Sequence, residues 1–375
     1  RDWSSDVCSS DLIKAWRENT STSPGSGRHL GHYKALLTRP AHRLTDNEKE
    51  GWRRKQEYII ECHVKVINYC IQYRYILERW KAICNMMIYK EVGNVKIHRL
   101  QIIHLYEADL SLFWGEHWRR AIHRAVKANS LHRGQYGGLP GRECKSVCFL
   151  EELRFDHSEI TRYPMANFDN DAAACYDRIL VALASLCGRK QGINRDVIFV
   201  HAKTLQEAKF TLKTKKGISE TSYTHCSAFP IHGTGQGLTN SPTIWCFISS
   251  ELFTVHSHEA NRMVFETPDG SFLIRINMVG FVDDSTCVTG GNRNTTFEEL
   301  IAMMQNDAQL WHDLLWTLGG KLELPKCGYH VVDYEFDGYG LAKKRFREGG
   351  DITLKDDKQN TVVIKAKSIF QPRKR

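Results

Sequence analysis

The spacing of apolar residues predicts a long amphipathic helix near the start of the chain. Between Asp46 and Lys81 these residues fall at three- and four-residue steps, the period of one helix face. We expect this face to pack against the rest of the protein. Its members are Tyr58, Ile59, Cys62, Val66, Ile67, Cys70 and Ile71.

A second well-marked helix is expected after Thr295. Thr295 and Glu298 have the spacing of a capping box, and Gly319 and Gly320 should end the helix. Its apolar stripe comprises Phe297, Ile301, Met304, Ala308, Trp311 and Leu315. Other helices are expected after the segment GLPGREC to about residue 160, over residues 177–187 and 195–208, and up to about residue 259.

Short apolar segments between the helices predict strands. Residues 86–89 and 100–105 should be two strands around the basic segment KEVGNVKIHR, which has a glycine for the turn. A hairpin is expected with Lys216 and Gly217 at its turn. The first pair would form a hairpin with basic groups at its tip.

Later strands carry acidic residues at their ends. Residues 163–168 should form a strand that ends at an acidic cluster, and residues 263–276 a hairpin with a PDG turn. Residues 277–288 predict another hairpin whose tip is Val282, Asp283 and Asp284. Two separate strands therefore deliver carboxylates to their ends.

The order of these elements is mixed rather than strictly alternating, which favours an α+β fold with a helix-backed, largely antiparallel sheet. Residues 1–12 repeat SSD and match neither helix nor strand periodicity, so we interpret them as a non-native tail. Residues 13–81 form a helical N-terminal part and residues 82–340 the main domain. From Lys343 onward the chain is basic and polar with little apolar periodicity, so we expect residues 341–375 to be either the start of another domain or a truncated tail.

Composition is that of an ordinary globular protein, with 42% hydrophobic and 25% charged residues. The longest apolar run, residues 179–187, is too short to cross a bilayer, and no secretory leader is evident. We therefore expect an intracellular protein without a membrane partner. The net charge of +9 favours a polyanionic partner.

Two acidic clusters could carry chemistry. They are FDNDAAACYD at residues 168–177 and GFVDDS at residues 280–285. Aspartates in turns often serve only to bond their own backbone. The second cluster is more informative, because apolar residues on both sides hold Asp283 and Asp284 at a strand end, where adjacent carboxylates repel each other.

Divalent cations relieve such repulsion. Mg²⁺ prefers carboxylate and phosphate oxygens, and two ions about 4 Å apart can activate a hydroxyl nucleophile and stabilise a leaving pyrophosphate. The pattern thus predicts two Mg²⁺ ions as cofactors, with Mn²⁺ as a substitute.

Four segments in order, DAAACYD, GTGQGLTNSP, FVDD and GGKLELPKC, resemble the palm motifs of reverse transcriptases, particularly those of non-LTR retrotransposons and group II introns. Upstream, SPGSGRHLGHYKAL resembles the N-terminal motif of that lineage, and GQYGGLPGREC resembles its QFGFRxGRS segment. The resemblance covers residues 23–334. It implies a right-hand polymerase with fingers and palm in residues 82–340 and the start of a thumb after residue 340.

The resemblance implies roles for matched residues. Asp171, Asp283 and Asp284 correspond to the metal-binding aspartates, whereas Asp169 comes two residues too early and would lie beside them. Val282 stands where alanine is more usual, which we expect to be conservative in a turn.

Residues that contact the nucleotide follow in the same way. Tyr176 would form the floor of the nucleotide pocket and exclude a ribose 2′-hydroxyl, although core packing is an alternative role. Gln236 and Gly237 would lie against the incoming nucleotide and the template base.

The remaining implied residues are basic or aromatic. Lys326 could protonate the departing pyrophosphate, or could be a solvated surface lysine. Lys90 and Arg99 would clamp the triphosphate. In the segment GYHVVDYEFDGYG, Tyr329 and Tyr334 are candidates to grip the primer end.

Together these features predict an RNA-directed DNA polymerase from a retrotransposon-like element. Its partners would be an RNA template, a DNA or RNA primer and dNTPs. An RNA-templated RNA polymerase and a non-catalytic nucleic-acid-binding scaffold remain alternatives. Tyr176 disfavours the first, and the presence of all three carboxylates disfavours the second.

Overall fold

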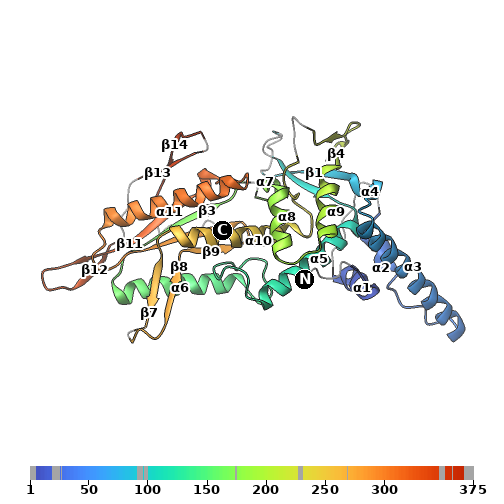
Figure 1. Cartoon of the computed structure of the whole chain (residues 1–375), viewed down its shortest axis with the longest axis horizontal. Helices are drawn as coiled ribbons and strands as arrows, with labels where there is room; N and C mark the ends of the chain where they lie inside the picture. Colours follow the sequence, from blue (N-terminus) through green and yellow to red (C-terminus); the bar gives the residue numbers. More distant parts are fainter. Residues whose placement is uncertain are drawn as a thin grey trace. The chain divides into compact units, whose positions relative to one another are not determined.

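The computed structural model describes residues 6–18, 26, 28–90, 96, 100–173, 175–226, 231–267, 269–345, 351–356 and 358–366. It contains both helices and sheets (Figure 1). The chain forms two compact units: residues 1–127 with 179–244, and residues 128–178 with 245–375. The boundaries that we predicted after residues 12, 81 and 340 remain predictions.

The first unit contains a sheet in the order β2-β1-β4-β5, with β6 also paired to β4. Strands β1 and β2 are antiparallel, as the sequence predicted, whereas β1 and β4 are parallel. The strands are β1 (Ala82–Tyr89), β2 (Leu100–Leu105), β4 (Lys209–Thr214), β5 (Gly217–Ile218) and β6 (Tyr223–Thr224).

Helices supply most of the first unit's core. The buried tryptophans Trp80, Trp114 and Trp118 belong to its helices. The helices are α1 (Ser9–Glu18), α2 (Leu30–Ala35), α3 (Asp46–Gln72), α4 (Glu78–Lys81), α5 (Ala108–Lys127), α8 (Val181–Lys190) and α9 (Arg195–Gln206). Helix α10 (Ser241–Glu259) begins in this unit's sequence and continues into that of the second.

The predicted helix over residues 46–81 is wrong at its end. Helix α3 stops at Gln72, because Arg74 adopts a positive φ of 53°, and the short helix α4 follows separately. Thr45 and Glu48 cap its start. The buried side comprises Ile60, Ile67, Cys70 and Ile71, while the expected members Tyr58, Ile59 and Val66 are exposed.

The absence of regular structure that we expected before residue 13 is also wrong. Helix α1 begins at Ser9, and Val7, Leu12 and Trp16 are buried. Asn68 of α3 fixes this segment, because its side chain bonds both the amide and the carbonyl of Val7.

The second unit is built on an antiparallel sheet in the order β12-β11-β3-β10-β9. The same unit contains two further two-stranded sheets, β7-β8 and β13-β14. Its strands are β3 (Met165–Asp171), β7 (Met263–Glu266), β8 (Leu273–Ile276), β9 (Met278–Phe281), β10 (Asp284–Gly290), β11 (Gly328–Phe336), β12 (Ala342–Arg345), β13 (Ile352–Lys355) and β14 (Thr361–Ile364). Its helices are α6 (Cys144–Thr161), α7 (Cys175–Arg178), α11 (Phe297–Thr317) and the 3₁₀ turn η2 (Leu324–Lys326).

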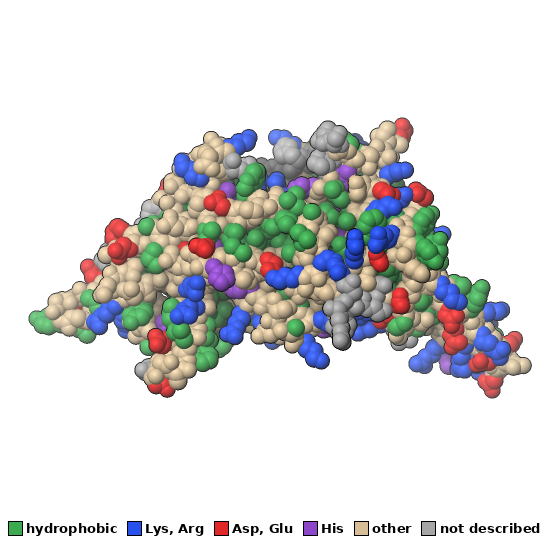
Figure 2. Space-filling view, in the orientation of Figure 1, with side chains coloured by type: hydrophobic (Ala, Val, Ile, Leu, Met, Phe, Trp, Pro, Cys, Tyr) green, Lys and Arg blue, Asp and Glu red, His purple; other side chains and the backbone are tan. Residues whose placement is uncertain are grey.

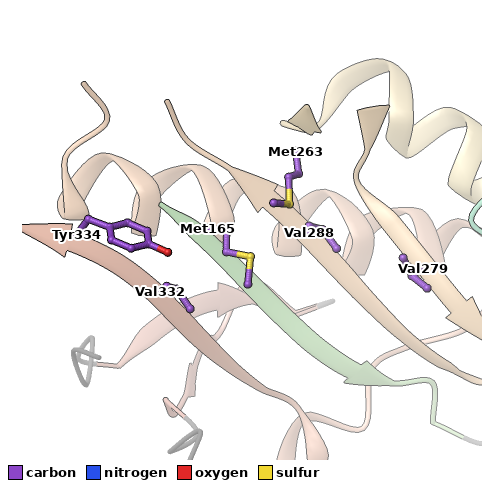
Figure 3. Close-up of a cluster of buried hydrophobic side chains, with 6 residues drawn as sticks. All are labelled: Met165, Met263, Val279, Val288, Val332 and Tyr334. Atoms are coloured by element: carbon purple, nitrogen blue, oxygen red, sulfur yellow. The ribbon is translucent and has the colours of Figure 1, made fainter. Parts of the chain in front are cut away.

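Helices back this sheet, as the sequence predicted. Alternation along β3 sends Phe168 and Asn170 to one face and Met165, Asp169 and Asp171 to the other. Helix α11 covers the first face, where Trp311 donates its indole N–H to the Asn170 side chain at 2.9 Å. The Met165 face holds an apolar cluster of Met165, Met263, Val279, Val288, Val332 and Tyr334 (Figure 3), against which side chains of α6 pack.

The capping box of α11 lies one residue later than predicted. Thr296 is the N-cap, and its partner is Glu299. The predicted end of the helix is confirmed, because Gly319 has a φ of 81° and the Gly320 amide bonds the Leu315 carbonyl.

Regular structure continues after Lys343, although the sequence there shows little apolar periodicity. Strands β13 and β14 pair there, and Ile352, Leu354 and Ile364 are buried. Side chains of α11 hold β13: Gln309 accepts from the Lys355 amide at 2.7 Å, and Gln305 accepts from the Thr353 amide at 3.0 Å.

Among the described residues, no helix combines the length and apolar character needed to cross a bilayer. Lys and Arg side chains are interspersed with acidic ones over the face shown in Figure 2.

Candidate active site

The register between β3 and β10 brings the two acidic clusters together. Asp171, the last residue of β3, is the cross-strand partner of Asp284, the first residue of β10. Directly opposed residues lie on the same side of an antiparallel pair, with Cβ atoms roughly 5 Å apart. Asp283 precedes Asp284 in the turn that joins β9 to β10. The three predicted carboxylates therefore meet at one end of the sheet.

The turn that carries Asp283 is held in a strained conformation. Val282 has a φ of 60°, a region that β-branched residues rarely adopt, so our expectation of a conservative replacement here is wrong. Trp245 donates its indole N–H to the Val282 carbonyl at 2.6 Å. Gly137 packs so closely that a Cβ there would come within 1.9 Å of the Val282 amide nitrogen.

The GQYGG segment has a clear structural role in supporting this hairpin. The Gly280 amide donates to the Gly134 carbonyl at 2.9 Å, and the Tyr136 amide donates to the Gly280 carbonyl at 2.9 Å. Arg142 completes the loop by donating to the Gln135 carbonyl at 2.5 Å. The segment thus adds a short parallel bridge beside β9.

Lys326 reaches the carboxylates through backbone pairing. The Glu323 amide donates to the Asp171 carbonyl at 2.8 Å, and the Ala173 amide donates to the Lys321 carbonyl at 2.8 Å. Turn η2 then directs Lys326, whose ammonium forms an ion pair with Asp171 Oδ2. The ion pair raises the pKa of Lys326, so this side chain stays protonated at neutral pH.

Crowding of the carboxylates shifts the pKa of Asp284. Burial, and then the charges of Asp283 and Asp171, raise the pKa of Asp284, while Lys326 lowers it. Tyr176 lies on α7 and is half-buried; burial, followed by Cys175 and Asp283, raises the pKa of its phenol. The Asp283 charge is therefore felt at Tyr176.

Asp169 points to the same face but plays a different part. Its Oδ1 accepts from the Thr286 hydroxyl at 3.0 Å, and its Oδ2 lies 3.9 Å from His330 Nδ1. Its predicted role, as a solvated carboxylate or one beside the metal ligands, stays a prediction.

A cavity of about 440 Å³ opens at this end of the sheet. Asp169, Asp171, Asp284 and Lys326 line one part of it, and Glu151 and Arg154 of α6 line another. Sequence reasoning missed Arg154, since nothing in the spacing of α6 shows which of its polar residues faces the sheet.

The three aspartates have the chemistry for a divalent cation, because carboxylate oxygens are the ligands that Mg²⁺ prefers and their mutual repulsion needs a cation. Lys326 supplies one positive charge there. The described part of the chain nevertheless contains no group of three or more His, Cys, Asp or Glu side chains arranged to hold a metal. Two-metal binding therefore remains a proposal.

The other predicted residues belong to the first unit. Gln236 accepts from the His104 amide through its backbone carbonyl at 2.7 Å. Gly237 has a φ of 118°, and a Cβ there would come within 2.5 Å of the His104 carbonyl oxygen, so the glycine permits close packing on β2. Lys90 is exposed just after β1, and Arg99 lies outside the described residues.

The expected primer-gripping tyrosines are corrected by the structure. Segment 328–345 does form a hairpin, β11-β12, but Tyr329 and Tyr334 are buried. Tyr334 packs in the apolar cluster and its hydroxyl contacts the Ser158 hydroxyl at 3.2 Å. Both side chains therefore stabilise the sheet.

No protein-family model matches the chain, and no curated protein is significantly similar to it. Among solved structures, the chain is similar to apo telomerase from Candida tropicalis, truncated from its C-terminal domain. The sequence identity is 11% and the TM-score 0.43, with 75% of this chain and 59% of that chain covered.

Proposed function

We propose that this chain is an RNA-directed DNA polymerase from a retrotransposon-like element, which adds deoxynucleotides to a primer 3′-hydroxyl. In this proposal the second unit's sheet is the palm of a right-hand polymerase, and the first unit contributes the fingers. The observation that carries it is the β3-β10 register, which opposes Asp171 and Asp284 beside Asp283. The specific activity, RNA-directed DNA synthesis, is inferred from the ordered sequence motifs.

Asp171, Asp283 and Asp284 are the proposed holders of two Mg²⁺ ions, for which Mn²⁺ could substitute. When bound, such ions neutralise the reacting phosphate and lower the pKa of the attacking hydroxyl. The carboxylates themselves fix the charge at a rigid strand end, which suits a reaction that depends on positioning and charge neutralisation.

Lys326 is the proposed proton donor to the departing pyrophosphate. Its raised pKa keeps a proton on Nζ, and its attachment to η2 places that proton beside Asp171. For a cation to reach Asp171 Oδ2, the ammonium has to move away, which its largely exposed side chain allows.

The proposed nucleotide contacts follow from the motifs. Tyr176, half-buried near Asp283, would press against the sugar and exclude a 2′-hydroxyl. Gln236 and Gly237 would contact the nucleotide and template base, and Lys90 and Arg99 would bind the triphosphate. The same resemblance implies an RNA template and a DNA or RNA primer as binding partners.

Two observations favour a second candidate, a non-catalytic palm that binds nucleic acid. The Lys326 ammonium already neutralises Asp171, and no three-ligand metal group is present in the described residues. An RNA-templated RNA polymerase would use the same carboxylates, and Tyr176 argues against it.

Primer extension on an RNA template tests these candidates together. We expect incorporation of dNTPs but not NTPs with Mg²⁺, and a loss of at least about a thousandfold in Asp283→Ala, since this residue's charge would be needed in the transition state. Glu335→Ala, a change of the same charge at an exposed position on β11, should extend as well as the parent protein.

The other outcomes separate the alternatives. Equal activity of Asp283→Ala and the parent would contradict the mechanism. Preference for NTPs would indicate an RNA polymerase. Tight RNA binding without extension in either protein would indicate the scaffold.

A further inference from the structure

Arg154 is a buried charge that the proposed mechanism does not use. It lies on α6, is 2% exposed, and projects toward the carboxylate-bearing face of the sheet, where it lines the cavity with Asp169 and Asp171. Within the described residues, neither its Nε nor its Nη1 has a hydrogen-bond partner.

Such an arrangement is costly for the folded protein. A buried guanidinium normally pairs with a carboxylate, because an unpaired buried charge loses its hydration without compensation. Burial accordingly lowers the pKa of Arg154, while Glu151, Asp169 and Tyr136 act at longer range in the opposite sense. The side chain therefore weakens the fold unless something else occupies its free N–H groups.

The cavity offers room for such a ligand. Its volume of about 440 Å³ falls in the range of small-ligand sites, ~300–1,000 Å³. Arg154 lines it together with Lys326, so two cationic groups face the same space. A planar guanidinium suits two oxygens of one phosphate group.

The charges of the cavity also limit what can enter. Glu151, Asp169, Asp171 and Asp284 line it as well, and four carboxylates would repel a free anion. A phosphate accompanied by a divalent cation on Asp171 and Asp284 would not be repelled. Binding of the two should therefore be coupled, each strengthening the other.

We propose that Arg154 binds a phosphate group that enters this cavity together with the divalent cation held by Asp171 and Asp284. This inference rests on the proposed function, which it deepens by assigning the phosphate a binding residue on α6. The phosphate could belong to pyrophosphate or to the primer backbone, and the two sources require separate experiments.

The experiment compares the parent protein with Arg154→Met and with Lys145→Met. Lys145 is on the same helix with an 84% exposed side chain, so its replacement removes the same charge away from the cavity. Mn²⁺ binding is measured first, by electron paramagnetic resonance. Pyrophosphate, and separately a short RNA–DNA duplex, are then titrated calorimetrically with and without Mn²⁺.

We expect all three proteins to bind Mn²⁺ alone, and Mn²⁺ to strengthen pyrophosphate or duplex binding in the parent. In Arg154→Met that binding should weaken at least about tenfold, the loss of a charge-assisted hydrogen-bonded contact. If only pyrophosphate binding weakens in Arg154→Met, the phosphate at Arg154 is that of the product. If only duplex binding weakens, it is a phosphate of the primer backbone. Lys145→Met should match the parent in both arms.

Thermal unfolding distinguishes binding from a structural role. Because Arg154→Met removes an unpaired buried charge, its melting temperature should equal or exceed that of the parent. A marked fall would show that Arg154 holds the fold through partners, and would overturn the proposal. Arg154→Lys, which retains the charge but lacks the planar guanidinium, should bind pyrophosphate or duplex with intermediate affinity.

Two failures can be told apart. A parent protein that binds no Mn²⁺ contradicts the proposed function. A parent that binds Mn²⁺, with Arg154→Met equal to it in both titrations, contradicts only the role of Arg154.

Discussion

The two ends of one sheet face in the second unit differ sharply in character. At one end Met165, Val288 and Val332 of adjacent strands are almost fully buried in the apolar cluster (Figure 3). At the other end of the same strands, Asp171 and Asp284 face each other beside a cavity. The change from apolar to acidic takes place within the seven residues of β3.

The difference shows how one strand pair can serve two purposes. Alternation keeps Met165, Asp169 and Asp171 on one side, so the apolar end anchors the strands that hold the carboxylates. Burial of the apolar side chains stabilises the fold, by about 1.5–3 kcal/mol for each fully buried one. That stabilisation offsets the repulsion and backbone strain at the acidic end.

Moving a carboxylate to the apolar end should have the largest effect. Met165→Asp would bury an unpaired charge within the cluster and should lower the free energy of unfolding by about 4 kcal/mol or more. Chemical denaturation followed by circular dichroism measures this. Met165→Leu, of similar volume, should cost less than about 1.5 kcal/mol; equal losses in the two variants would contradict the contrast between the ends.

Relieving the strain at the acidic end should have a moderate effect of opposite sign. Val282→Gly removes a β-branched side chain from a positive φ and should raise the free energy of unfolding by about 1 kcal/mol. Val282→Ala should lie between the two. The same denaturation measurement applies, and a parent protein at least as stable as the glycine variant would show that the turn is not strained.

Neutralising one crowded carboxylate should have the smallest effect, and it should depend on pH. The pKa of Asp284 is raised above 3.8 in the folded state, so the folded state binds a proton on this carboxyl more tightly than the unfolded state does. The free energy of unfolding therefore falls as the pH rises from 3.8 through the folded-state pKa. Asp284→Asn lacks this loss, and should melt about 1–2 °C above the parent at pH 7 in the presence of chelator.

The control for this variant is the same melting measurement at acidic pH. As the pH falls below the raised pKa of Asp284, the parent's carboxyl becomes protonated, and the difference in melting temperature should shrink toward zero. A difference that stays constant as the pH falls from 7 to below that pKa would show that the crowding of Asp284 does not affect stability.

Local signals were enough to predict the hairpin that carries Asp283 and Asp284. An apolar run, two acidic residues at the tip and a resumed apolar run specify strand, turn and strand without outside information, and β9 and β10 follow this pattern. Strand β3 was predicted for the same reason. The meeting of Asp171 with Asp284 could be inferred only from the resemblance, because pairing between distant strands leaves no local signal.

Features that depend on distant packing were missed. The helical pattern continues past Gln72, yet the chain turns at Arg74, whose guanidinium pairs with Asp196 of α9. Strands β13 and β14 are short, and side chains of α11 supply part of the hydrogen bonds of β13. Arg154 was missed because helical spacing does not show which neighbour covers a polar side chain.

Locating Mn²⁺ directly tests the central claim most stringently. Anomalous diffraction from crystals grown with Mn²⁺ and a primer–template duplex should show density among the carboxylates of Asp171, Asp283 and Asp284, with the Lys326 ammonium displaced from Asp171. Crystals in which Lys326 still pairs with Asp171, and in which no anomalous density lies at these three side chains, would contradict the account.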